Sequence, residues 1–400
     1  MYRSVFILFF LVTISCSKKE FKVESIQFPY GNNNAQPNLV SKDGNLTLSW
    51  ISSVENQEAV LFYTQYKDNS WSEPVRITSG SDWFVNWADF PANAINGNLL
   101  LTSYLKKSAS GTYTYDILLN LETLSRKKIK DNFLLNTDGI KAEHGFVSMI
   151  PNNSSGFYVT WLDGRNTVIN TKETHHKAMT IRFAEITSTG EIINETELDA
   201  TTCDCCQTSI ALSSEGPIVV YRNRSEDEIR DIYITKYRNG IWEQPVPVFN
   251  DGWEINGCTV NGPKVVVNKT TTAVAWFTAA DDNPKVNLSF SLTDKDEFNL
   301  PIQLNDLDAI GRVDVAFLNS KEVLVSYMEF DDNATYLNVK KVTVEGEVSK
   351  AFTISKIDSG RETGVPQLEV MDNVVYLVWT NMVDGKNQLK FVKFNSDDLQ

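Results

Sequence analysis

The chain has 400 residues, of which 42% are hydrophobic and 11% aromatic, and it carries a formal net charge of −14 with a pI near 4.8. This much apolar material is enough for a large core and excludes an intrinsically disordered chain. A surface with this much negative charge repels a phosphate backbone, and we therefore expect no nucleic-acid partner. Basic groups in a cleft could still bind a small anion.

The first residues read as an export signal. Arg3 supplies a positive charge ahead of an apolar run at 5–14, which is shorter than the ~20 residues that a membrane span needs. Thr13-Ile14-Ser15-Cys16 resembles a bacterial lipobox, in which the cysteine is acylated. We therefore predict a lipoprotein signal peptide at 1–15, a lipidated tether at 16–21 and one folded domain at 22–400. The alternative is an ordinary cleaved signal peptide in which Cys16 is incidental.

The remainder of the chain repeats a short apolar strand that ends in an aromatic residue. Gly, Asn and Asp turns separate the strands, and no helical period is evident. The seven aromatics lie 51 to 60 residues apart, at Trp50, Tyr104, Trp161, Tyr221, Trp276, Tyr327 and Trp379. That spacing is typical of a four-stranded blade, so we predict an all-β fold with a single seven-bladed β-propeller and keep six blades as the alternative.

The last repeat has no fourth strand of its own, because only six residues follow its third strand. The segment 22–28, which precedes the first repeat, is predicted to supply that strand. Pairing the two ends of the chain would remove the exposed edges of an open sheet.

Propeller geometry predicts one polar funnel. The loop before each inner strand opens on one face, and the loop between the second and third strands returns to that face. Most of the chemically distinctive side chains occupy such loops, although propeller loops are polar in any case. The candidate catalytic residues are Asp89, Glu143, Asp163 and Glu228, and the candidate ligand-binding residues are Trp87, Arg165, Arg222, Arg224, Arg230, Trp253, Asn261, Arg312 and Arg361.

Four cysteines enter neighbouring blades and are predicted to meet: Cys203, Cys205, Cys206 and Cys258. In an exported protein the first interpretation is two disulfides: Cys203 or Cys205 could pair with Cys258, and Cys205 could form a strained vicinal bridge with Cys206. The second is a copper or zinc site of thiolates completed by His144. Free redox-active thiols are the third.

Three further features each have two interpretations. The alternating charges at 222–231 form either a self-paired loop or an anion clamp. Trp83, Trp87 and Trp253 either pack between blades or stack on a sugar ring. The His175-His176 pair is either a solvated loop or a second set of metal ligands.

The chain resembles the sialidase-like propellers built from bacterial-neuraminidase repeats. The resemblance covers about 40–390 and rests on motifs such as DWFVNWADFP (82–91), EHGFVS (143–148), CDCCQT (203–208), YRNRSEDEIRDI (221–232), GCTVNGP (257–263) and a degraded Asp-box at 291–298. It implies three arginines on a substrate carboxylate, a tyrosine nucleophile activated by a glutamate, and an aspartate acid/base. Arg222 or Arg224, Arg312 and Arg361 could supply the arginines. The Phe/Tyr-Arg-Ile-Pro motif of sialidases is absent, and the sequence does not locate the Tyr–Glu pair.

The leading hypothesis is recognition, with or without hydrolysis, of an acidic glycan or similar anionic ligand, by an exo-sialidase-like glycoside hydrolase if the protein is an enzyme. A metal-binding (copper or zinc) or redox envelope protein and a non-catalytic interaction platform are the alternatives. We expect a monomer in the cell envelope, held to the outer membrane only by its lipid anchor, on the periplasmic or the surface face.

Overall fold

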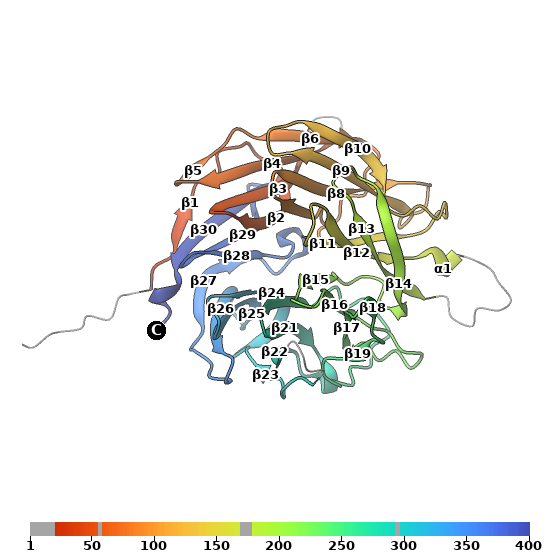
Figure 1. Ribbon diagram of the computed structural model, residues 1–400. Coiled ribbons are helices and arrows are strands. Elements are labelled where there is room, and N and C mark those ends of the chain that lie inside the picture. The colour runs from red at the N-terminus through yellow and green to blue at the C-terminus, as the bar shows by residue number, and fades with distance from the viewer. Residues whose placement is uncertain (1–20, 55–57, 169–177, 293–296) are drawn as a thin grey trace, which may run out of the picture.

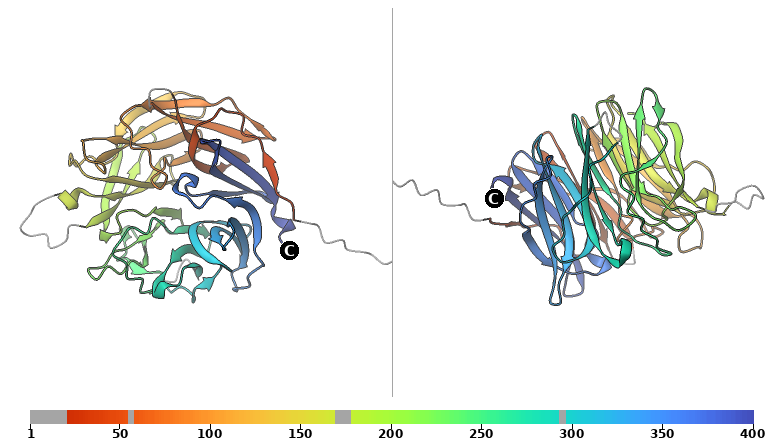
Figure 2. Two further views of the ribbon diagram at one scale, coloured as in Figure 1. Left: turned by 180° about the vertical axis from the view of Figure 1, so that it is seen from behind. Right: turned by 90° about the horizontal axis from the view of Figure 1, so that it is seen from below.

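The computed structural model describes residues 21–54, 58–168, 178–292 and 297–400, and its strands form seven sheets. The sheets follow one another around a central axis (Figure 1). The strands nearest to the axis include β2 (Asn34–Lys42), β11 (His144–Pro151), β15 (Ser209–Leu212), β24 (Asp308–Phe317) and β28 (Gln367–Met371). Figure 2 shows the same ring from behind and from below. The predicted seven-bladed β-propeller is confirmed, and the six-bladed alternative is wrong.

Each blade is an antiparallel sheet whose innermost strand comes first in sequence, except that blade 7 also takes its outermost strand from the N-terminal end of the chain. Blade 1 contains β2 (Asn34–Lys42), β3 (Asn45–Ser53), β4 (Ala59–Lys67), β5 (Ser70–Trp71) and β6 (Val75–Gly80). Blade 2 contains β7 (Asn93–Asn96), β8 (Leu99–Lys107), β9 (Tyr115–Thr123) and β10 (Lys128–Leu134). Blade 3 contains β11 (His144–Pro151), β12 (Phe157–Asp163), β13 (Met179–Ile186) and β14 (Ile192–Thr202).

The second half of the ring repeats this order. Blade 4 contains β15 (Ser209–Leu212), β16 (Pro217–Arg222), β17 (Ile232–Arg238), β18 (Ile241–Trp242) and β19 (Val246–Pro247). Blade 5 contains β20 (Lys264–Asn268), β21 (Thr271–Thr278), β22 (Lys285–Leu292) and β23 (Ile302–Gln303). Blade 6 contains β24 (Asp308–Phe317), β25 (Glu322–Phe330), β26 (Thr335–Thr343) and β27 (Phe352–Ile357).

Blade 7 closes the ring with strands from both ends of the chain. It contains β28 (Gln367–Met371), β29 (Val374–Val383), β30 (Lys386–Asn395) and the N-terminal β1 (Glu24–Ile26). Strand β1 pairs antiparallel with β30, Glu24 opposite Lys393 and Ile26 opposite Phe391. The predicted closure is therefore confirmed, and it covers the edge of β30 that would otherwise be open.

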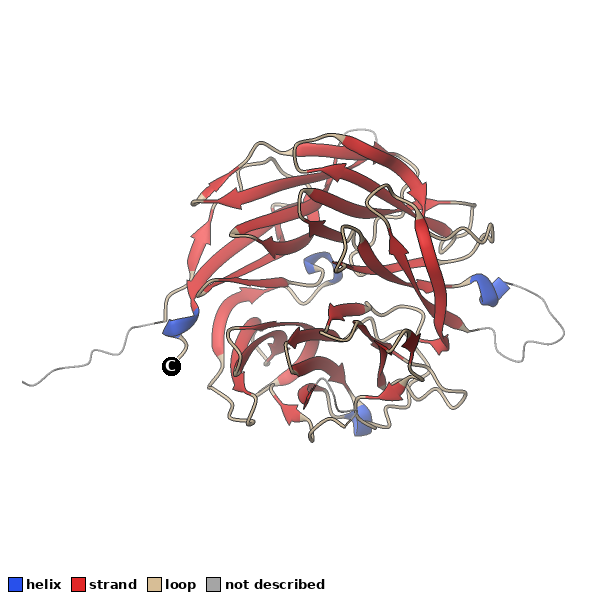
Figure 3. Ribbon diagram, viewed as in Figure 1, coloured by secondary structure: helices blue, strands red, loops and turns tan. Residues whose placement is uncertain are grey.

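Helical structure is confined to short turns among the described residues, as Figure 3 shows. These are α1 (Arg165–Val168), η2 (Ala280–Asp282), η3 (Arg361–Thr363) and η4 (Ser396–Asp398). No helix in the described part of the chain has the length and hydropathy needed to cross a membrane.

The repeated aromatic residues fill the spaces between blades. All seven lie on the second strand of their blade, and none is more than 4% exposed. Trp161, for example, is fully buried in a cluster with Tyr115 and Phe157 that joins blades 2 and 3. Burying each such side chain contributes about 1.5–3 kcal/mol, so the sequence repeat marks the contacts that hold the ring together.

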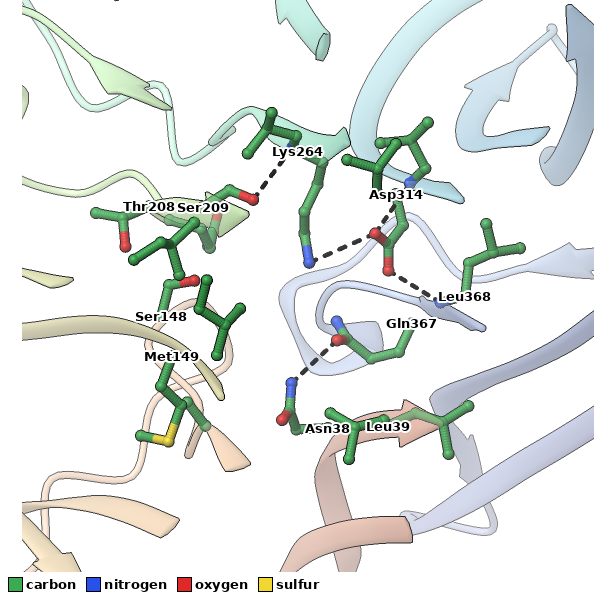
Figure 4. Close-up of a pocket in the computed structure, with 18 of the residues that line it drawn as sticks. Asn38, Leu39, Ser148, Met149, Thr208, Ser209, Lys264, Asp314, Gln367 and Leu368 are labelled. Carbon is green, nitrogen blue, oxygen red and sulfur yellow. Dashed lines mark hydrogen bonds and ion pairs between the residues drawn. The ribbon is translucent and has the colours of Figure 1, made fainter. Parts of the chain in front are cut away.

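The inner strands surround a polar channel with a volume of about 400 Å³. Lys264 and Asp314 face each other across 3.6 Å within it, and the Asn38 amide donates to the Gln367 side chain at 3.2 Å (Figure 4). Asp314 also accepts hydrogen bonds from the backbone N–H groups of Val315 and Leu368. These polar groups are thus largely satisfied by one another and by the inner strands.

Several predictions concern residues outside the described part of the chain. These are the signal peptide, the lipidation site Cys16 and the His175-His176 pair. The centre of the degraded Asp-box, 293–296, also lies outside it.

Candidate functional site

One cavity of about 340 Å³ opens among the loops that lead into the inner strands, and we call it the funnel pocket. Five of the seven blades contribute to its walls. The lining residues are Phe84, Asn86, Trp87, Ala88, Asp89, Tyr113, Tyr115, Glu143, Phe146, Asp204, Cys205, Cys258, Val260 and Arg361. Ala88 and Phe146 also line the polar channel, so the channel begins behind the pocket. Its volume is within the ~300–1,000 Å³ range of small-ligand sites.

Two carboxyl groups converge on one phenol in this pocket. The Tyr115 hydroxyl lies 2.9 Å from Glu143 Oε1 and 3.2 Å from Asp89 Oδ2. Tyr115 begins β9, and a parallel β-bridge to Glu143 fixes the two backbones side by side. The three groups therefore come from the loops before β7 and β11 and from the start of β9.

Burial changes the proton affinity of all three groups. It raises the pKa of Glu143 to about 7 and that of Asp89 to about 8. Burial, assisted by the two neighbouring carboxyls, also raises the pKa of Tyr115 well above its usual value. The cluster therefore keeps the phenol protonated, and Glu143 titrates near neutral pH, as a general base or acid requires.

The backbone around Asp89 is shaped to hold it. Asp89 Oδ1 accepts a 2.6 Å hydrogen bond from the backbone N–H of Phe146. A Cβ atom on Gly145 would lie 1.9 Å from Asp89 Oδ2, so only glycine allows this approach. Asp89 thus positions the Tyr115 hydroxyl from the buried side of the pocket. Glu143 is the more accessible of the two carboxyl groups.

The raised pKa of Asp89 predicts that the free energy of unfolding depends on pH. Between its usual pKa of 3.8 and about 8, the folded protein holds a proton that the unfolded chain releases. Stability contributed by this group is therefore present at low pH and is lost as the pH rises through that interval. We expect Asp89→Asn to flatten the fall in unfolding free energy across that range, measured by urea denaturation. An unchanged pH dependence would contradict the assignment, and Asp43→Asn on an exposed turn is the control.

Two of the arginines predicted to bind an anion are instead occupied by main-chain carbonyl groups. Arg222, only 1% exposed, donates to the carbonyls of Asn261 at 2.9 Å, Phe277 at 2.7 Å and Arg230 at 2.6 Å. Its guanidinium also lies 4.9 Å from the centre of the Trp253 ring. Arg222 and Trp253 therefore join blades 4 and 5 rather than face a ligand.

Arg312 joins blades 6 and 7 in the same way. Its guanidinium donates to the carbonyls of Gly360 at 2.9 Å, Gly364 at 3.0 Å and Ser359 at 3.1 Å. It stacks 4.8 Å from the centre of the Trp87 ring, which lines the funnel pocket. The Asn261 side chain, another predicted ligand, accepts from the backbone N–H of Arg312 and donates to the Ile310 carbonyl.

The charged run at 222–231 is largely paired within itself. Glu228 binds Arg224 at 2.6 Å and Arg230 at 2.7 Å, and Arg224 also reaches Asp204. The hydrogen bond from Arg224 lowers the pKa of Glu228, which therefore remains a carboxylate and is not suited to donate a proton. The self-paired loop thus describes this segment better than the anion clamp.

Arg361 is the predicted arginine that faces the funnel pocket. It begins η3, is exposed, and forms no ion pair with any described residue. Its charge is therefore available to an anion in the pocket.

A second polar cluster gathers the remaining predicted residues away from the pocket lining. Arg165 chelates Asp163 at 2.7 and 2.8 Å, and it also contacts Asp138 and Glu195. His144, fully buried, lies 3.2 Å from Asp138 and 3.6 Å from Asp163. The prediction that His144 completes the cysteine site is wrong, because its side chain turns toward these carboxylates.

The cysteines do not form the predicted disulfides: all four described cysteines are free. Cys203 Sγ lies 3.9 Å from Cys205 Sγ and 3.7 Å from Cys206 Sγ, whereas a disulfide bond measures about 2.05 Å. Cys258 is exposed and lines the funnel pocket together with Cys205.

Three aromatic residues of the funnel pocket were not predicted from the sequence: Phe84, Tyr113 and Tyr115. The ring of Phe84 stacks on Tyr115 with centres 4.2 Å apart. Tyr113 lies near the end of the loop between the second and third strands of blade 2, which returns to the funnel face, and Tyr115 directly follows that loop. The same topological rule that selected Asp163 and Arg222 could therefore have found both tyrosines.

No protein-family model matches the chain, and no curated protein matches it. Solved structures similar to it include an ulvan lyase of polysaccharide lyase family PL25 bound to -[GlcA(1-4)Rha3S]-, with TM-score 0.59, 10% identity, and coverage of 93% of this chain and 96% of that one. The phage phi92 endosialidase gives TM-score 0.54 at 12% identity, covering 94% of this chain and 69% of that one. At such identities the likeness shows the β-propeller fold alone.

Proposed function

We propose that this protein cleaves an acidic glycan in the funnel pocket, with Glu143 and Tyr115 transferring protons and Arg361 binding a carboxylate of the substrate. The observation that carries the proposal is the 2.9 Å hydrogen bond between Tyr115 and Glu143 inside this pocket. A catalytic acid and base must reach the same substrate atoms, and this pair is already joined.

The walls of the pocket suit a sugar with one negative charge. Trp87, Phe84 and Tyr113 contribute apolar surface to these walls, and Arg361 contributes a cation. The lyase and endosialidase structures with the same fold act, by their names, on polysaccharides or sialic acids, and the lyase structure holds a glucuronate-containing unit. These likenesses support a uronate-containing polysaccharide as the class of substrate.

Elimination next to a carboxylate is the reaction that these groups favour. Arg361 would neutralise the uronate carboxylate and so make the adjacent C5–H acidic, and Glu143 would accept that proton. The C5–H electron pair forms the C4–C5 double bond, the C4–O bond breaks, and the leaving oxygen takes the Tyr115 proton. Glu143 then returns its proton to the Tyr115 phenolate through their hydrogen bond, which restores both groups.

Hydrolysis through a tyrosine nucleophile is the second candidate, because the same hydrogen bond would let Glu143 remove the phenol proton. One observation favours elimination. The three-arginine clamp of sialidases is not assembled, since Arg222 and Arg312 bind carbonyl groups.

We also propose that the protein acts in the cell envelope, tethered through acylated Cys16. The apolar run and lipobox-like sequence support this location. A tether there would place the funnel pocket where extracellular or periplasmic polysaccharides arrive.

Arg361→Ala tests the role of the pocket cation. A charged hydrogen bond contributes about 1.5–3 kcal/mol, so we expect kcat/KM on the best of ulvan, polygalacturonate and alginate to fall by about 10- to 100-fold. Neutral dextran should not be cleaved by either protein. Arg76→Ala, which removes an exposed arginine paired with Glu58, is the matched control and should be fully active. Equal activity of Arg361→Ala and the unmodified protein would refute this role.

A further inference from the structure

Three thiols form a cluster in the loop between β14 and β15. Cys203 is fully buried and Cys206 is 2% exposed, whereas Cys205 is partly accessible at the wall of the funnel pocket. The three sulfur atoms all lie within 4.8 Å of one another. Glycan cleavage as proposed above uses none of them.

The spacing of the sulfur atoms fits one metal ion. Zinc binds thiolate sulfur at about 2.3 Å, and two such ligands at a tetrahedral angle lie about 3.8 Å apart. The observed separations from Cys203 Sγ are 3.7 and 3.9 Å. No large movement of the loop is therefore needed for a common ion to contact these sulfurs.

Neighbouring side chains prepare the sulfurs for a cation. Arg230 Nη1 donates to Cys203 Sγ at 3.2 Å, and Thr259 Oγ1 lies 2.8 Å from Cys206 Sγ. Glu228 holds the other end of the Arg230 guanidinium at 2.7 Å. Such outer contacts orient metal ligands and stabilise the thiolate form that binds metals.

The charges favour a divalent ion. Three thiolates and one zinc(II) ion carry a net charge of −1, and the Arg230 guanidinium, 3.2 Å from Cys203 Sγ, lowers the cost of burying that charge. Copper(I) is also a soft, thiolate-binding d10 ion, but it would leave the same group of charges one unit more negative.

We propose that Cys203, Cys205 and Cys206 bind a single thiophilic d10 metal ion, zinc(II) or copper(I), at the wall of the funnel pocket. Cys258 lies outside the three-sulfur cluster, although it lines the same pocket. It therefore provides a matched cysteine control.

The test measures metal binding and does not depend on glycan cleavage. Full-length protein purified anaerobically under reducing conditions is titrated with zinc against a chromophoric chelator, and separately with copper(I) against bicinchoninate. We expect one equivalent of zinc or copper(I), the stronger competitor identifying the ion. Cys258→Ser should bind equally well, and Cys206→Ser should bind at least about 100-fold more weakly.

Two measurements keep the test decisive if Cys206→Ser fails to fold. Cys205→Ser changes a partly exposed side chain and should show the same weakening. X-ray absorption of the metal-loaded unmodified protein should show sulfur ligands at about 2.3 Å. Failure to bind either ion, or equal affinity in Cys205→Ser and the unmodified protein, would overturn the proposal and leave three packed thiols.

Discussion

Tyr115→Phe is expected to lower kcat/KM on an acidic polysaccharide by about 10²- to 10⁴-fold while leaving the protein folded. The change removes only the hydroxyl that joins Glu143 and Asp89, and with it the proton donated to the leaving oxygen. The ring remains stacked on Phe84, so packing is preserved. Initial rates and thermal denaturation of both proteins provide the measurement.

The matched control is Tyr63→Phe, a buried tyrosine of blade 1 outside the funnel pocket. It should retain the activity of the unmodified protein. If Tyr115→Phe keeps more than about a tenth of the activity, general acid catalysis by Tyr115 is contradicted.

Arg222→Ala is expected to destabilise the protein by about 3–5 kcal/mol, because it removes a buried cation and leaves several main-chain carbonyls without donors. The loss should appear as a lower urea midpoint. Arg361→Ala, which removes an exposed side chain at the pocket, should change stability by less than about 0.5 kcal/mol.

The two arginines thus separate a structural role from a binding role. A stable Arg222→Ala protein with impaired substrate binding would restore Arg222 as an anion ligand and contradict the structural assignment. The same outcome would indicate that the carbonyl contacts of its guanidinium contribute little to the joint between blades 4 and 5.

The fold could be predicted because the same short sequence pattern recurs once in each blade. A buried aromatic such as Trp161 or Trp276 is needed wherever two blades pack, so it returns once in each blade. The missing fourth strand of the last repeat likewise required β1, since an unpaired edge would otherwise remain.

The site could be predicted only in part, because topology assigns a residue to a face but not to a partner. Asp89, Glu143 and Arg361 do reach the funnel pocket. Arg312 lies early in the inner strand β24, yet its guanidinium donates to the carbonyls of blade 7. The sequence pattern does not indicate whether such a side chain points into the pocket or toward a neighbouring blade.

His144 illustrates the same limit at shorter range. It directly follows Glu143, but alternation along the strand sends the two side chains to opposite sides. Glu143 therefore meets Tyr115, and His144 meets Asp138 and Asp163.

Cleavage of a uronate-containing glycan by elimination, with Glu143 and Tyr115 as the proton-transfer groups, can be recognised by mass spectrometry of the products. The unmodified protein and Glu143→Gln are incubated with ulvan, polygalacturonate and alginate. We predict fragments from at least one polymer that carry an unsaturated uronate at the new non-reducing end, and none with Glu143→Gln. Fragments whose new non-reducing ends are saturated, or intact polymers with a folded protein, would rule out this elimination.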